Sequence, residues 1–158
     1  MEGHKKGFMI AAIEQSMLGV KGATGGPFGA VVVKGGEIIA RGYNQVTMNN
    51  DPTAHAEIVA IREACKKLNS FQLSGCEIYT SCEPCPMCMG AIYWARPDKV
   101  YYANTKADAA EAGFDDQFIE TEFSVPPTDR RIPMIQMMRD EALTAFEAWK
   151  AKTGRIDY

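Results

Sequence analysis

Hydrophobic residues recur at steps of three and four positions in two long segments of the chain, which is the pattern of a helix with one buried face. The first segment covers about residues 5–20, and the second covers Ala54–Leu68, with His55 and Glu57 in its first turn. A third segment, Cys85–Ala95, is dense in apolar side chains. We therefore predict two amphipathic helices followed by a shorter and more buried one.

Short runs of strand-forming residues lie between and after these helices. Phe28–Val33 and Glu37–Gly42 are separated by Lys34-Gly35-Gly36, a connection typical of a hairpin, so they are expected to pair antiparallel. Glu77–Ser81 and Lys99–Ala103 flank the third predicted helix, and a helical crossover joins parallel strands. This order of elements predicts an α/β fold, a three-layer α/β/α sandwich with a mixed central sheet.

The remaining segments carry weaker patterns. We expect Asn44–Pro52 to be a loop, Ile132–Met138 to be a strand and Asp140–Lys152 to be a helix. A chain of 158 residues can bury one sizeable core, and no shift in composition marks a linker before Pro126-Pro127. Residues 1–158 are therefore predicted to form a single domain.

Composition and charge restrict the class of partner. Apolar residues make up 46% of the chain and charged residues 23%, as in ordinary globular proteins. The net charge of −3 is divided into +2 over residues 1–106 and −5 over residues 107–158. Nucleic-acid binding depends on clustered lysine and arginine, so we expect a small-molecule substrate and no nucleic-acid partner. No apolar run approaches the roughly 20 residues of a membrane helix, so we expect a cytoplasmic protein with no membrane partner.

Candidate chemistry is concentrated in two motifs, Thr53-Ala54-His55-Ala56-Glu57 and Cys82-Glu83-Pro84-Cys85-Pro86-Met87-Cys88. Either motif alone would be weak evidence, because a lone histidine is usually structural and a C-x-x-C pair can be redox-active. Together they offer one imidazole and two closely spaced thiolates, a ligand set that suits Zn²⁺ and leaves a fourth position open for water. The sequence therefore predicts a zinc site.

Two arrangements of that site remain open. In a closed arrangement, His55, Cys82, Cys85 and Cys88 would surround the metal, and zinc would only hold the fold together. Glu57 favours an open arrangement, because a carboxylate two residues after the histidine can act as general base toward a water at the metal. We expect the open site, with His55, Cys85 and Cys88 as ligands.

The sequence resembles the cytidine deaminase superfamily, and within it the small bacterial guanine deaminases, across nearly the whole chain. The segments that carry the resemblance are Gly25 to Ala30, Asn50 to Glu57, Thr80 to Cys88, Gly90 to Arg96, Ala109 to Asp116, and Tyr158. The resemblance implies a cytidine deaminase-like fold and one zinc ion per chain, with Cys82 not a ligand. It also implies a homodimer in which the C-terminal segment, residues 126–158, is exchanged between subunits.

The resemblance further implies a set of substrate-binding residues. These are Phe28, Asn44, Ala56, Trp94, Asp116 and Tyr158. Phe28 would stack on a base, Asn44 and the Ala56 backbone would contact its polar edge, and Tyr158 would close the pocket of the partner subunit. Plainer roles stay open, with Asn44 capping a turn, Phe28 filling the core and Asp116 lying in a solvated acidic loop.

The reaction implied is hydrolytic deamination of a free purine base, with guanine giving xanthine and ammonia. Zinc would activate the attacking water, and Glu57 would accept its proton and return protons to the ring nitrogen and the departing amine. Cytosine, guanosine and, less favourably for an acidic chain, adenosine in tRNA are alternative substrates of the same chemistry. A zinc-stabilised interaction module is the alternative outside the enzymes.

Overall fold

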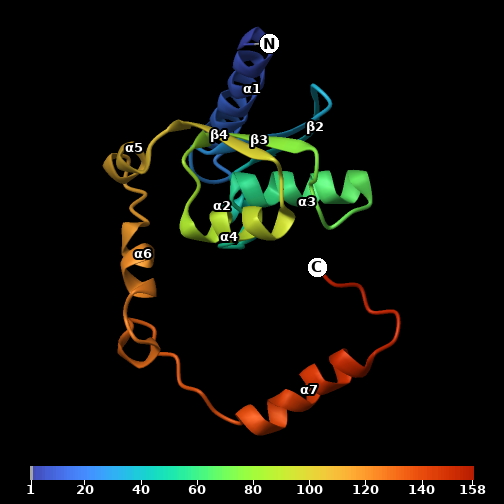
Figure 1. The fold of residues 1–158 in the computed structure, drawn as a ribbon. Coiled ribbons are helices and arrows are strands. Elements are labelled where there is room, and N and C mark those ends of the chain that lie inside the picture. The colour runs from blue at the N-terminus through green and yellow to red at the C-terminus, as the bar shows by residue number, and fades with distance from the viewer. Residues whose placement is uncertain (1) are drawn as a thin grey trace. The chain divides into compact units, whose positions relative to one another are not determined.

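A four-stranded mixed sheet is the centre of residues 2–117 in the computed structural model, which describes residues 2–158 (Figure 1). The strands are β1 (Gly29–Lys34), β2 (Glu37–Tyr43), β3 (Cys76–Cys82) and β4 (Lys99–Asn104). They lie in the order β2-β1-β3-β4, in which β1 pairs antiparallel with β2 and β3, whereas β3 and β4 are parallel. The predicted mixed sheet is confirmed.

Helices cover both faces of this sheet, as the three-layer prediction requires (Figure 1). One face packs against α1 (Glu2–Lys21), and the other packs against α3 (Ala56–Leu68) and α4 (Pro86–Ala95). Alternation along β1 sorts its side chains, since Val31 lies in the cluster with α1 and Val32 lies in the cluster with α3 and α4. Both valines are fully buried, so both faces of the sheet are core.

The hairpin between β1 and β2 follows the prediction closely. Gly35 and Gly36 both have positive φ, 58° and 83°, the conformation in which a two-residue turn matches the twist of its strands. The segment expected to be a loop contains one helical turn, α2 (Val46–Asn49). That turn ends at Asn50, which adopts the left-handed conformation with φ 50°.

Two helices begin later than predicted, α3 by two residues and α4 by one, in a way that matters for the site. His55 is the N-cap of α3 and not a residue of its first turn, and Cys85 is the N-cap of α4, with Pro86 as the first helical residue. Proline suits that position because it has no N–H to satisfy. Two of the three predicted metal ligands, His55 and Cys85, therefore stand at the amino end of a helix.

The C-terminal third contains elements that the hydrophobic pattern did not indicate. After β4, a capping box formed by Thr105 and Asp108 starts α5 (Lys106–Glu111). Residues 118–158 form a second unit, with most of α6 (Gln117–Phe123), a 3₁₀ turn η1 (Pro127–Asp129) and α7 (Arg139–Ala151). The helix expected over 140–152 is confirmed, but the strand expected over Ile132–Met138 is wrong, because that segment is irregular and pairs with no strand of the described chain.

Candidate metal and catalytic site

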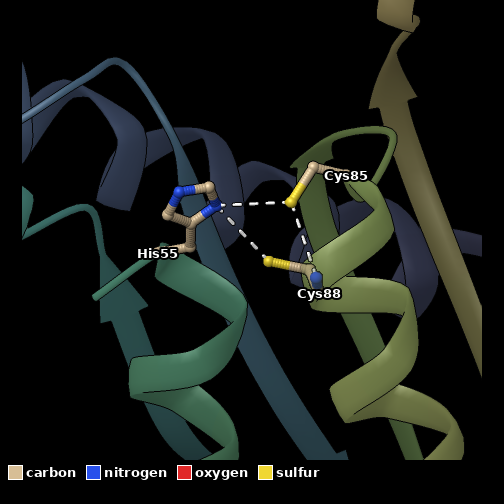
Figure 2. A group of neighbouring side chains, drawn as sticks. All are labelled: His55, Cys85 and Cys88. Carbon is tan, nitrogen blue, oxygen red and sulfur yellow. Dashed lines mark hydrogen bonds between the residues drawn. The ribbon is translucent and has the colours of Figure 1, made fainter. Parts of the chain in front are cut away.

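Three side chains from two helix starts converge on one point in the structure (Figure 2). Nδ1 of His55 lies 3.5 Å from Sγ of Cys85 and 3.5 Å from Sγ of Cys88. Within residues 2–158 these three form a group whose ligand atoms all lie within 4.8 Å of one another, so they can hold a metal ion.

The helix starts explain why these ligands meet. The sulfur of Cys85 serves as the N-cap of α4 and accepts a hydrogen bond from the backbone N–H of Cys88 at 3.5 Å. Cys88 lies three residues further on, within the first turn, so both sulfurs face the positive end of the helix dipole. That field favours thiolates, the form of cysteine that binds metals.

Hydrogen bonds link the protonation of the three groups. A hydrogen bond from the Cys88 thiol, with a further one from His55, lowers the pKa of Cys85 to about 4. The hydrogen bond to Cys85, together with burial, raises the pKa of Cys88, and the bond to Cys85 raises that of His55. A soft divalent cation would take the place of these shared protons, and the set of one nitrogen and two sulfurs fits zinc.

A buried carboxylate stands beside the ligands. Glu57 lies in the first turn of α3 and is only 6% exposed, and burial raises the pKa of its side chain. Its Oε2 is 3.5 Å from Sγ of Cys88, and its Oε1 accepts a hydrogen bond from the hydroxyl of Thr80 at 3.2 Å. A carboxylate that takes up protons readily, placed next to a metal site, is suited to act as a general base.

Cys82 is close in sequence to the ligands but lies outside their group. Its thiol donates to the backbone carbonyl of Thr105 at 3.5 Å, and burial raises its pKa to about 11. A thiol that is hard to ionise and turned toward a carbonyl is a poor metal ligand. The geometry favours the open arrangement of three ligands over the closed arrangement of four.

Asn44 has a side chain whose orientation is fixed by the backbone around it. Its Oδ1 accepts hydrogen bonds from the N–H groups of Gly26 and Val46, both at 3.2 Å. A Cβ at Gly25 would overlap that oxygen and lie 2.8 Å from the Asn44 carbonyl oxygen, so the loop requires glycine there. The acceptor expected to read a base is thus occupied, and the amide NH₂ is the part of Asn44 that can serve a ligand.

Aromatic and acidic residues from the loop after α5 return to the same region. The rings of Phe28 and Phe114 meet edge to face, with centroids 5.0 Å apart and planes at 87°. Asp116 acts electrostatically on His55, whose pKa is raised first by its hydrogen bond to Cys85 and further by the charges of Cys85, Glu57 and Asp116. Phe114 was given no role from the sequence, although it lies within the segment Ala109 to Asp116 that carries the family resemblance.

The structure gives less information about the other three residues expected to bind substrate, Ala56, Trp94 and Tyr158. Ala56 is fully buried as the first residue of α3, where a backbone N–H has no partner within the helix. Trp94 is 63% exposed near the carboxyl end of α4, about 9 Å along the helix axis from Cys88. Tyr158 belongs to the second unit, residues 118–158.

Comparison with known proteins agrees with this geometry. The family model of the cytidine and deoxycytidylate deaminase zinc-binding region matches residues 2–104, so the chain belongs to this family of zinc-binding deaminases. It is 55% identical over 151 residues to the guanine deaminase of Bacillus subtilis (strain 168), covering 96% of this chain and 97% of that relative. The X-ray structure of guanine deaminase from Bacillus subtilis superposes with a TM-score of 0.94 at 54% identity, covering 97% of this chain and 98% of that one. A tRNA-specific adenosine deaminase of Aquifex aeolicus (strain VF5) is 51% identical, but over only 49% of this chain and 51% of its own length.

Proposed function

We propose that the protein is a zinc-dependent aminohydrolase that converts guanine to xanthine and ammonia. The observation that carries the proposal is the convergence of His55, Cys85 and Cys88 with the buried carboxylate of Glu57, in a chain similar to a guanine deaminase over nearly its whole length. Zinc, when bound by the three ligands, supplies Lewis-acid activation of the hydrolytic water.

Glu57 performs the proton transfers in this proposal. Its carboxylate accepts the proton of the water that attacks C2 of guanine, the carbon that bears the amino group. The same group passes this proton to the adjacent ring nitrogen, then takes the proton of the hydroxyl group now on C2 and gives it to the departing amine. The hydroxyl oxygen becomes the carbonyl oxygen of xanthine and ammonia leaves, so one carboxylate acts twice as base and twice as acid. Burial supports both roles, because a raised pKa brings the group closer to the working pH.

Pocket residues orient the base for this attack. The amide NH₂ of Asn44 donates to an acceptor on the purine, since its oxygen is held by Gly26 and Val46. Phe28 presents its ring to the base, with Phe114 fixing the ring plane. A site of this kind rejects a base that leaves its polar groups unpaired, which is how such pockets gain specificity.

The C-terminal segment is proposed to complete the site of a partner subunit in a homodimer, within a single functional domain spanning residues 1–158. The unit of residues 118–158, taken by itself, leaves large apolar side chains exposed, with Phe146 at 66% and Tyr158 at 70%. A unit of this length has no core of its own, so its apolar side chains need the surface of another part of the protein to be buried.

Complementation between two impaired variants tests the exchange. A Glu57→Gln chain keeps its tail but lacks the base, whereas a chain without residues 155–158 keeps the base but lacks the tail. If the tail acts across the dimer, co-expressed mixed dimers contain one complete site and are more active than either parent. If the tail acts within its own chain, mixing restores no activity.

Release of ammonia across a panel of compounds tests the substrate. We expect guanine to be the best substrate among guanine, guanosine, cytosine, adenine and a short RNA. Turnover of guanosine or cytosine without guanine would reject the substrate while keeping the zinc chemistry. A zinc-loaded protein that deaminates none of these compounds would favour an interaction module.

The cellular compartment follows from the ligands. Cys85 and Cys88 are free thiols in the structure and must remain reduced to bind metal, which suits a reducing compartment such as the cytoplasm. Across residues 2–158, helices long and apolar enough to span a bilayer are absent.

A further inference from the structure

Thr80 is a buried residue of β3 whose hydroxyl faces the catalytic carboxylate. It is 1% exposed, and its Oγ1 lies 3.2 Å from Oε1 of Glu57 and 3.0 Å from the backbone carbonyl oxygen of Cys82. The 3.0 Å distance is at the upper limit for a hydroxyl donor and the 3.2 Å distance lies just beyond it, as expected when one proton is shared between two acceptors. The hydroxyl thus links Glu57 on α3 to the end of β3, the strand that leads to Cys85 and Cys88.

The two oxygens of Glu57 consequently have different surroundings. Oε1 receives the donor from Thr80, whereas Oε2 lies toward Sγ of Cys88 and the metal ligands. A half-turn of the carboxylate would only exchange two equivalent oxygens, but any smaller rotation would remove the hydrogen bond to Thr80 from a group that is almost completely buried. The hydroxyl therefore fixes the plane of the carboxylate, so that one oxygen is held by Thr80 while the other points at the metal site.

Sheet geometry holds the hydroxyl in place. Alternate residues of β3 face opposite sides, so Ile78 and Thr80 lie toward α3, whereas Tyr79 lies toward α1. Thr80 is paired with Ala30 on one side and with Tyr102 on the other, so its backbone is held by both neighbouring strands. A donor on such a central strand varies little in position.

We propose that Thr80 is a positioning residue for the reaction: it holds Oε1 of Glu57 and so reserves Oε2 for proton exchange with water and substrate. The Cys82 carbonyl has a part in this arrangement. Its oxygen lies 3.0 Å from Oγ1 of Thr80 and so holds the hydroxyl next to the carboxylate. The proposal rests on the proposed role of Glu57 and assigns Thr80 no contact with substrate.

The test compares three variants as zinc-loaded full-length protein. Thr80→Val keeps the shape but removes the donor, Thr80→Ser keeps the donor, and Tyr79→Phe removes a buried hydroxyl that bonds to Glu77 on the other face of β3. We expect Thr80→Val to lower kcat by about 10- to 100-fold, as a displaced catalytic group does, while KM stays within about twofold. Thr80→Ser should recover most of the wild-type kcat, and Tyr79→Phe should retain it.

Zinc content and the thermal unfolding midpoint are measured on the same samples, so that a loss of metal or of fold is seen directly. If Thr80→Val does not fold, Thr80→Ala against Thr80→Ser makes the same comparison. Zinc loss in the hydroxyl-free variants, equal kcat losses in the serine and hydroxyl-free variants, or wild-type kcat without the hydroxyl would each overturn the proposal. The comparison uses whichever substrate the wild-type protein deaminates best, so a wrong assignment of guanine leaves it intact.

Discussion

Replacing Glu57 by glutamine separates the proton chemistry from the metal site. The amide is nearly isosteric with the carboxylate, and its oxygen can still accept the hydrogen bond from Thr80 that Oε1 accepts at 3.2 Å. The NH₂ group would then face Sγ of Cys88, where a metal-bound thiolate can accept from it. We therefore expect Glu57→Gln to fold, to bind one zinc per chain and to bind guanine.

The expected loss of activity follows from the proton transfers assigned to this residue. A positioned general base contributes about 10²- to 10⁴-fold, and the amide can neither accept the proton of the water nor return it. We expect kcat to fall by at least about 10²-fold, which corresponds to about 2.7 kcal/mol of transition-state stabilisation. KM should change little, because glutamine disturbs neither Asn44 nor Phe28.

The assay is steady-state ammonia release from guanine, with zinc content measured on the same samples. A Glu57→Gln protein that holds its zinc and works at near wild-type rate would refute the assignment of Glu57 as the base. Loss of zinc together with activity would mean that the carboxylate supports the metal site instead.

The same variant has a consequence for stability in the metal-free protein. Burial raises the pKa of Glu57 in the folded state above its ordinary value of 4.5. The protonated side chain thus stabilises the fold fully below about pH 4.5, and this contribution is lost as the pH rises through the folded-state pKa. Glutamine is neutral throughout, so Glu57→Gln should raise the thermal midpoint of the metal-free protein at pH 7, and the gain should shrink toward pH 4.5. A midpoint difference that does not vary with pH would contradict this.

Three further predictions concern the surroundings of the site. Cys82→Ser should leave zinc content and turnover close to wild type, whereas Cys85→Ser should strip the metal, and equal zinc loss in both would restore the closed four-ligand site. Gly25→Ala should destabilise the fold by about 1–3 kcal/mol in denaturant unfolding, because its Cβ overlaps Oδ1 of Asn44. Gly90→Ala, which meets nothing within 4 Å in a helix, is the control and should not destabilise. Deleting Arg155–Tyr158 should lower kcat/KM for guanine at least about tenfold at an unchanged thermal midpoint, since an enclosed pocket excludes water, and wild-type turnover of that deletion would reject a role as a lid.

Much of the fold could be predicted from the sequence because most of its helices and turns are specified by residues close together in the chain. The glycine pair of the hairpin and the three- and four-residue spacing in α3 each specify one element without reference to the rest of the chain. The strand expected over Ile132–Met138 failed for the opposite reason. Its apolar residues satisfy a strand pattern, but a strand also needs a neighbour to pair with, and no strand of the described chain supplies one.

In the candidate site, too, features set by local spacing could be predicted from the sequence, and features set by distant parts of the chain could not. The closeness of two of the candidate ligands was predictable, because the spacing of Cys85 and Cys88 corresponds to one turn of helix. The orientation of Asn44 was not, since it depends on N–H groups of Gly26 and Val46, which come from both sides of the first two strands. The contact between Thr80 and Glu57 joins residues 23 positions apart, and only the register of the sheet against α3 brings them together.

The separation of the ligands along the chain suggests an order for building the metal site. Cys85 and Cys88 are three positions apart and approach each other as soon as the first turn of α4 forms, but His55 is 30 positions before Cys85 and joins them only when α3 docks. A newly made chain could therefore hold zinc loosely through two sulfurs before the imidazole arrives. The change from two to three ligands would then mark the moment at which both helices have settled on the sheet, and a cobalt-substituted protein could report that moment by its colour during refolding.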